Sequence, residues 1–106
     1  METKLITLSN VTAQEVIENF QKSFQPDVHV DCSNSGNLVH IFVFEEYFMR
    51  IESNLACTII FNQGQTGSLD ISIIVAGGSH GFFGITWGAE TSTLNRVKGF
   101  LDKYQK

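Results

Sequence analysis

The segment from Leu38 to Ile51 constrains the fold most, because it has the pattern of one long β-strand with apolar residues on both faces. Successive side chains of a strand point to opposite sides of a sheet. One side would carry His40, Phe42, Phe44, Glu46, Phe48 and Arg50, and the other Val39, Ile41, Val43, Glu45, Tyr47 and Met49. A strand covered on one side only alternates apolar with polar residues, so this one predicts protein or ligand against both faces.

Shorter segments share this period of two. Alternating apolar residues predict further strands at 5–8, 28–32, 55–61 and 69–75. The loops at 33–37, 52–54 and 62–67 have the length of hairpin connections, whereas parallel neighbours need long crossovers. We therefore predict an antiparallel meander, to which residues 82–87 could add one short strand.

Two other segments follow the helical period. The first repeats apolar residues at Ala13, Ile17, Phe20 and Phe24, and the second at Leu94, Val97, Leu101 and Tyr104, widened by Phe100. Thr12 and Glu15 have the spacing of a capping box, and Thr91 or Ser92 would cap the second helix.

The resulting order is strand, helix, four strands, helix. It predicts an α+β fold within one domain, residues 1–106, in which two helices cover one face of an antiparallel sheet of five to six strands. This two-layer arrangement resembles, in topology, the TATA-binding-protein-like or helix-grip class. Such folds carry many functions, so the resemblance implies no particular activity.

A closer resemblance rests on residues 44–50, Phe-Glu-Glu-Tyr-Phe-Met-Arg, on the Gly-Gly run at 77–78, and on residues 83–89, Phe-Gly-Ile-Thr-Trp-Gly-Ala. Together these segments resemble an uncharacterised family of short bacterial proteins known only as a domain of unknown function. The resemblance implies a stand-alone bacterial protein, and it carries no activity over to this chain.

Charge and apolar content argue against several partners. The formal net charge is −4 and no lysine or arginine occurs between Arg50 and Arg96, which disfavours a nucleic-acid phosphate backbone. No apolar run has the length of a membrane span or a signal peptide. We expect a cytoplasmic protein that binds neither nucleic acid nor a membrane. Cys32 and Cys57 share the pleat phase of apolar neighbours, which predicts buried, reduced thiols, whereas export of the protein would allow a disulfide between them.

Candidate catalytic and ligating residues are few. Residues 77–88 hold five of the nine glycines, but they lack the spacing and the basic residue of phosphate-binding loops, so a bulge or tight corner is favoured. His29 and His40 would be close across a hairpin with Asp31 nearby, which is a conceivable metal site, although an exposed histidine pair is the more common arrangement. Ser79 and His80 lack a third catalytic group. We predict no metal, cofactor or catalytic site.

The surplus of apolar surface suggests a function. Ile60, Ile74 and Ala76 would extend the second apolar face of residues 38–51 beyond what two helices can cover. We predict a non-enzymatic homodimer that buries this face, or the glycine-rich stretch, against a second copy. The alternative is a small apolar ligand held between curved sheet and helix. Its pocket would be lined by Phe20, Phe24, Phe42, Phe44, Phe82 and Trp87. An enzyme acting through His80 ranks third.

Overall fold

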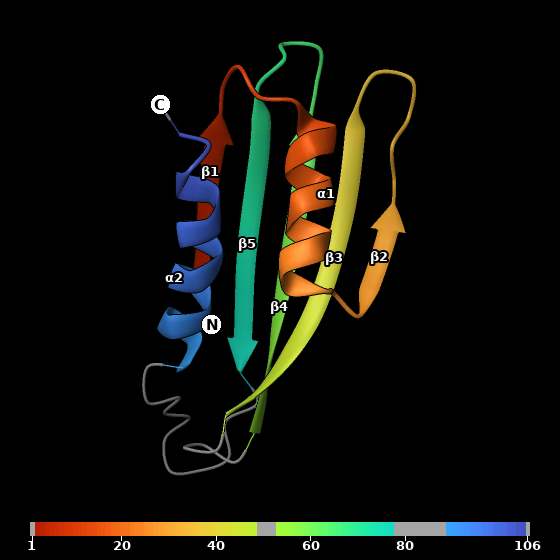
Figure 1. The fold of residues 1–106 in the computed structure, drawn as a ribbon. Coiled ribbons are helices and arrows are strands. Elements are labelled where there is room, and N and C mark those ends of the chain that lie inside the picture. The colour runs from red at the N-terminus through yellow and green to blue at the C-terminus, as the bar shows by residue number, and fades with distance from the viewer. Residues whose placement is uncertain (1, 49–52, 78–88, 106) are drawn as a thin grey trace.

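Five strands and two helices make up the regular structure of this chain in a computed structural model, which describes residues 2–48, 53–77 and 89–105. In chain order they are β1 (Glu2–Leu8), α1 (Ala13–Phe24), β2 (Val28–Asp31), β3 (Leu38–Phe48), β4 (Ser53–Gln63), β5 (Leu69–Gly77) and α2 (Ala89–Asp102) (Figure 1). This order confirms the predicted α+β class. The extra strand considered at residues 82–87 falls outside the described residues.

The strands form one sheet in the order β1-β5-β4-β3-β2, and every neighbouring pair is antiparallel. Strands β2 to β5 are the predicted meander, and β1 adds to it beside β5. The connection through α1 therefore runs from one edge of the sheet to the other, and both edges are visible in Figure 1. Short loops explain the antiparallel pairing of β2 to β5, because a hairpin turn can only reverse the chain.

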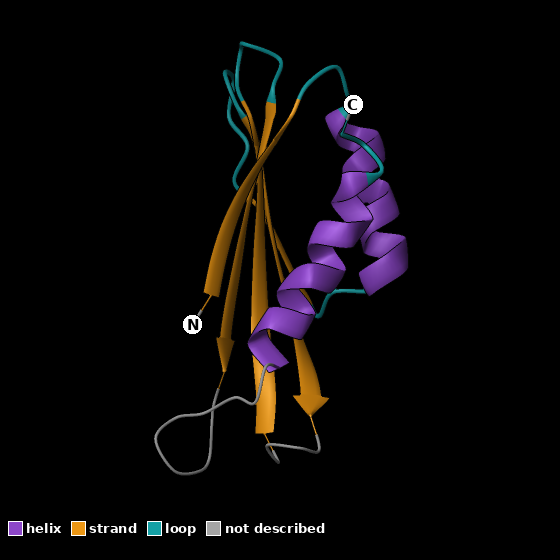
Figure 2. Ribbon diagram, turned by 90° about the vertical axis from the view of Figure 1, so that its left-hand side faces the viewer, coloured by secondary structure: helices purple, strands orange, loops and turns teal. Residues whose placement is uncertain are grey.

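Both helices lie on the same side of the sheet, as Figure 2 shows. The first helix, α1, follows Thr12, which is the predicted N-cap residue, but within the described structure the Thr12 side chain makes no capping hydrogen bond. The buried residues of α1 lie on its predicted apolar face and are Ala13, Val16, Ile17 and Phe20. The helix ends at Gln25, whose left-handed backbone (φ 47°) lets its N–H bond to the Gln21 carbonyl.

The second helix begins earlier than predicted. It starts at Ala89 rather than after Thr91 or Ser92, and Tyr104 lies beyond its end at Asp102. In the first turn of this helix, Glu90 Oε2 accepts a hydrogen bond from the backbone N–H of Gly77 at 3.0 Å. That bond fastens the first turn of α2 to the end of β5.

The core lies between the helices and one face of the sheet. Strict alternation along β1, β3, β4 and β5 directs buried side chains to this side: Ile6, Leu8, Phe42, Phe44, Leu55, Cys57, Ile59, Phe61, Leu69, Ile71, Ile73 and Val75. Leu94, Val97 and Leu101 of α2 cover them. Each fully buried large side chain contributes about 1.5–3 kcal/mol, so this layer accounts for most of the stability of the fold.

Strand β2 differs from its prediction. Val28 and Val30 are 48% and 46% exposed, and Cys32, predicted to be buried, is exposed. The register explains the error, because His29 pairs with Phe42 and so takes the helix-bearing side, which turns both valines to the other side. Cys57 is buried as predicted, and burial raises the pKa of its thiol to about 12, with a smaller contribution from the Glu46 carboxylate.

Candidate functional site

The phenylalanines predicted to line a ligand pocket come together under α1. The ring of Phe20 lies 5.4 Å from that of Phe42 and 6.5 Å from that of Phe44, and Phe24 lies 5.5 Å from Phe44. Phe61 and Phe100, which the sequence analysis did not include, complete the cluster at 5.4 and 6.0 Å from Phe20. The rings thus contact one another, mostly in tilted and edge-to-face geometries that aromatic pairs prefer.

The other two predicted pocket residues, Phe82 and Trp87, lie outside the described residues. The same is true of His80 and of the glycine-rich stretch beyond Gly77. Nothing is therefore assigned to these positions, and the role predicted for each of them remains a prediction.

The opposite side of the sheet has no helix over it in the described part of the chain (Figure 2). Cross-strand register places ten residues there in two adjacent rows, which we call the helix-free face. One row consists of Thr3, Ile74, Thr58, Val43 and Val28, and the other of Leu5, Ser72, Ile60, Ile41 and Val30. None of the ten is charged, and eight are β-branched. Leu5 is 64% exposed, more than Val28 or Val30 on the same face.

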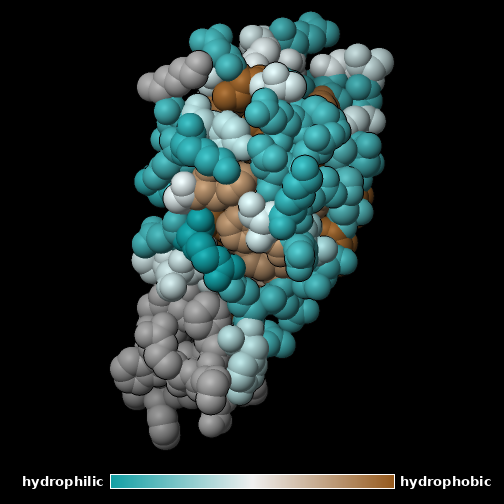
Figure 3. Space-filling model, viewed as in Figure 1, coloured by the Kyte–Doolittle hydropathy of each residue, from teal (hydrophilic) through white to brown (hydrophobic). Residues whose placement is uncertain are grey.

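Polar groups border the helix-free face at both ends of the strands. At one end the Thr7 hydroxyl donates to Asp70 at 2.8 Å, and Asn62 lies between Asp70 and β3 in the register. At the other end Glu45 is exposed, and its backbone N–H donates to the Asp27 carboxylate at 3.1 Å. The helix-bearing side looks different in Figure 3, where hydrophilic side chains dominate and apolar ones are visible mainly between the two helices.

A histidine pair lies at the β2 edge, on the helix-bearing side. His29 Nε2 is 2.7 Å from His40 Nδ1, with ring centroids 5.0 Å apart and planes at 24°. These values mean that the rings meet edge to edge, nitrogen facing nitrogen. The His29 ring also stacks on Phe42 at 4.3 Å. This confirms the predicted proximity of the two histidines across the hairpin.

The third group beside the pair is Asp31, whose Oδ1 lies 3.9 Å from His40 Nε2. Hydrogen bonds from the Ser33 hydroxyl and backbone N–H lower the pKa of Asp31, so it remains a carboxylate. Two nitrogens that bind one tetrahedral zinc ion at about 2 Å each lie about 3.3 Å apart, so the 2.7 Å between the facing nitrogens is too short for such a site. Among the described residues, no group of three or more His, Cys, Asp or Glu side chains has metal-binding geometry.

A second polar cluster joins β3 to α2. Arg96 Nη1 lies 2.5 Å from Glu46 Oε2, and the Thr93 hydroxyl donates to Glu46 Oε1 at 3.0 Å. The guanidinium carbon of Arg96 also lies 5.5 Å from the centroid of the Phe24 ring. No partner for Glu46 is predictable from the sequence, in which the i, i+3 spacing of Thr93 and Arg96 on one helix is the signal for this cluster. With both oxygens engaged, Glu46 acts as an anchor for α2.

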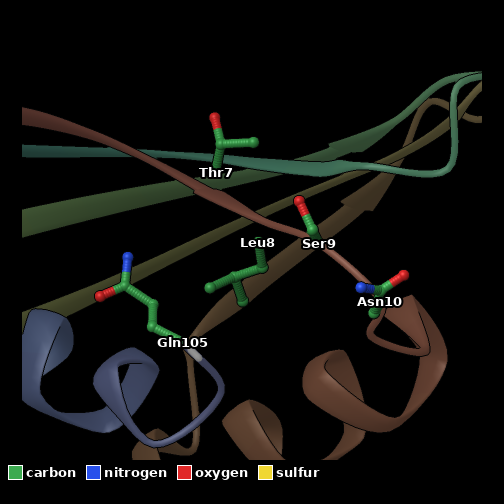
Figure 4. A pocket seen from close by; sticks show the side chains of 5 residues that line it. All are labelled: Thr7, Leu8, Ser9, Asn10 and Gln105. Atoms are coloured by element: carbon green, nitrogen blue, oxygen red, sulfur yellow. The ribbon is translucent and has the colours of Figure 1, made fainter.

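Two shallow depressions lie near the β1–α1 connection. The larger, of about 460 Å³, is lined by Thr7, Leu8, Ser9, Asn10 and Gln105 (Figure 4). The smaller shares Asn10 and extends along the start of α1 to Lys103 and Tyr104. Neither includes a predicted pocket phenylalanine. The larger offers only amide, hydroxyl and apolar side chains, which supply no nucleophile and base pair.

A family model described as "Family of unknown function (DUF6054)" matches residues 4–105. No curated protein and no solved structure matches the chain. Neither helix of the described residues is long and apolar enough to cross a membrane.

Proposed function

The chain belongs to this family of unknown function, and we propose that it acts as a non-enzymatic homodimeric interaction module, pairing two copies through the helix-free face. The observation that carries the proposal is the pair of uncharged rows running across all five strands. When one face of a sheet is exposed to water in a monomer, its positions ordinarily carry polar and charged side chains. Here the charges lie only beyond the rows.

The chemistry of the helix-free face is that of an interface core. Interface cores are depleted of charged residues and surrounded by a polar rim. Leu5, Val28 and Val30 remain about half exposed or more in the single chain, whereas Ile41 and Ile60 are already partly covered by their neighbours. Glu45 and Asp70 would then form the hydrated rim.

The size of the helix-free face also suits a dimer. Five strands about 4.8 Å apart give a width of about 24 Å, and four rows about 6.8 Å apart, rims included, give a length of about 27 Å. The product is roughly 650 Å² in projection, and side-chain relief increases the accessible area. A standard stable interface buries about 800 Å² on each partner, which the helix-free face approaches once its polar rims are counted with it.

A second copy is the occupant that this face favours. Without charged side chains in the two rows, a two-fold axis through the face brings no like charges together at its centre. Side chains that are mostly β-branched make a level surface, and two such sheets pack about 10 Å apart with strands crossing at about 30°. A charged partner would find no complementary group in the rows.

The two thiols favour a reducing compartment. Cys32 is exposed at the end of β2, Cys57 is buried under the helices, and both are free. Free thiols are typical of proteins in reducing cytoplasm. We therefore infer a cytoplasmic location for the dimer.

Sedimentation equilibrium and native mass spectrometry of the full chain test the dimer. We expect a dimer at micromolar concentration, and a monomer when Ile60→Glu places a charge in the centre of the helix-free face. The control is Ser23→Glu, which adds the same charge at an exposed position of α1. Leu5→Glu is a second probe, because its exposed side chain carries little of the fold.

The outcomes separate the two hypotheses drawn from the sequence. A wild-type chain that stays monomeric at high micromolar concentration overturns the dimer. A monomer that retains a small apolar mass would instead support ligand binding by the phenylalanine cluster. We rank that alternative second, because a ligand would have to separate rings now 5.4 Å apart at Phe20 and Phe42.

A further inference from the structure

We propose that the histidine pair makes dimerisation sensitive to pH, by holding β2 in place while it supplies two valines to the helix-free face. This inference rests on the proposed function and adds its regulation. Strand β2 alternates its side chains, so that His29 and Asp31 point to the helix-bearing side and Val28 and Val30 to the other. A change in the histidine contact therefore acts on the opposite face through four residues of backbone.

The contact between the histidines depends on how many protons they share. His29 Nε2 and His40 Nδ1 face each other at 2.7 Å, so one nitrogen donates and the other must be bare. A first extra proton can reside on a nitrogen outside this bond, and it makes the bond charge-assisted. A second extra proton leaves both facing nitrogens, His29 Nε2 and His40 Nδ1, as N–H groups that point at each other, and both rings are then positively charged. The bond then breaks.

The surroundings of the pair support this two-step behaviour. The Oδ1 of Asp31 lies 3.9 Å from His40 Nε2. Two apolar side chains also adjoin the pair: Phe42 stacks against His29, and Phe61 of β4 is opposite His40 in the register. The Asp31 carboxylate therefore supplies one negative charge beside a pair that can carry two positive charges.

Strand β2 has few other attachments. It is an edge strand of four residues, all exposed, and it pairs with β3 alone. Flanking backbone bonds run from Asp27 N to the Val43 carbonyl and from Cys32 N to the Val39 carbonyl, each at 2.9 Å. Short exposed edge elements open at low free energy. When the histidine contact breaks, we expect β2 to open and Val28 and Val30 to leave the helix-free face.

The test measures the dimer dissociation constant of the full chain by sedimentation equilibrium, from neutral pH down through the ordinary titration range of histidine, about pH 5 to 7. For the wild type we expect a rise of roughly tenfold on acidification, as the dimer loses the contacts of two valines. In His29→Gln the amide can donate to or accept from His40, so we expect less than a twofold change. The control is Ser23→Gln, at an exposed position of α1, and it should behave like the wild type.

Amide hydrogen exchange of residues 28–31, measured at the same pH values, separates the two proposals. Faster exchange in acid in the wild type but not in His29→Gln supports release of β2. A neutral-pH dimer whose acid response is identical in wild type and His29→Gln overturns the histidine coupling and leaves the dimer intact. A chain that is monomeric at every pH overturns the proposed function, whatever the exchange of β2.

Discussion

The two faces of the sheet are built from the same strands and differ in the size of their side chains. Phenylalanine, leucine and isoleucine fill the helix-bearing face, whereas valine, isoleucine, threonine and serine fill most of the helix-free face. Large side chains reach up between helices, which present a ridged surface. Short β-branched side chains make a level surface that matches another sheet. Both faces are largely apolar, so the length of the side chains is what distinguishes the helix-bearing face from the helix-free face.

The largest expected difference between the faces concerns stability. Phe20→Ala should lower the free energy of unfolding by about 3–5 kcal/mol, because it empties the centre of the aromatic cluster. Ile60→Ala, on the helix-free face, should cost about 1 kcal/mol when measured at concentrations where the chain is monomeric. Urea denaturation of both variants measures these losses. Equal losses would mean that both faces are core within a single chain.

Two neighbouring glutamates allow a finer comparison. Glu46→Ala should cost about 2 kcal/mol, because the Thr93 hydroxyl, in a residue only 1% exposed, loses its acceptor. Glu45→Ala, one residue earlier and on the other face, should change stability by about 0.5 kcal/mol or less. Thermal and urea unfolding of the two variants give the answer. Comparable costs would remove the anchoring role of Glu46.

Alkaline pH should affect the helix-bearing face through Cys57. Its folded pKa of about 12 lies above the ordinary 9.0, so the folded chain holds a proton that the unfolded chain releases. The protonated Cys57 thiol therefore contributes fully to the free energy of unfolding below pH 9. Between pH 9 and 12 this free energy falls by about 1.4 kcal/mol per pH unit. Urea titrations against pH, compared with Cys57→Ala, isolate the effect. A slope unchanged in the variant would assign it to other groups.

The smallest effect concerns labelling of the two thiols. An exposed Cys32 should react with a thiol reagent at neutral pH, while buried Cys57 should react only on unfolding. Because Cys32 adjoins β2 and the helix-free face, we expect its labelling to slow several-fold in the dimer. Reagent consumption followed at low and high protein concentration measures this. Fast labelling of Cys57 in native buffer would contradict the packing described above.

Local periodicity was enough to predict the order of elements. Period two along residues 55–61 and 69–75 and the helical repeat through Phe20 are set by each segment alone, and the structure confirms them. The two apolar faces of residues 38–51 were also evident from the sequence. Which of the two the helices cover was not, because both satisfy the same pattern.

Features that depend on the pairing register of the strands could not be predicted from the sequence. In β2, apolar Val28 and Val30 suggested an inward phase, yet pairing of His29 with Phe42 turned them outward. The partner of Glu46 could not be predicted either, since Arg96 approaches only after α2 has docked. The aromatic cluster was predicted in part, but Phe61 joined it from a strand whose packing partner was unknown.

The position of β1 has a consequence for how the chain is made. Leu8 pairs with Leu69, so the first strand to leave the ribosome waits for the last strand of the sheet. During that interval α1 can pack on β3 and β4, because Phe20 contacts Phe42, Phe44 and Phe61. Long-range pairing of this kind slows folding, because a large loop has to close before any contact offsets its entropy. Until β5 joins the sheet, β1 has no partner and the edge of β4 is unpaired, and it is then that a chaperone would have most to shield.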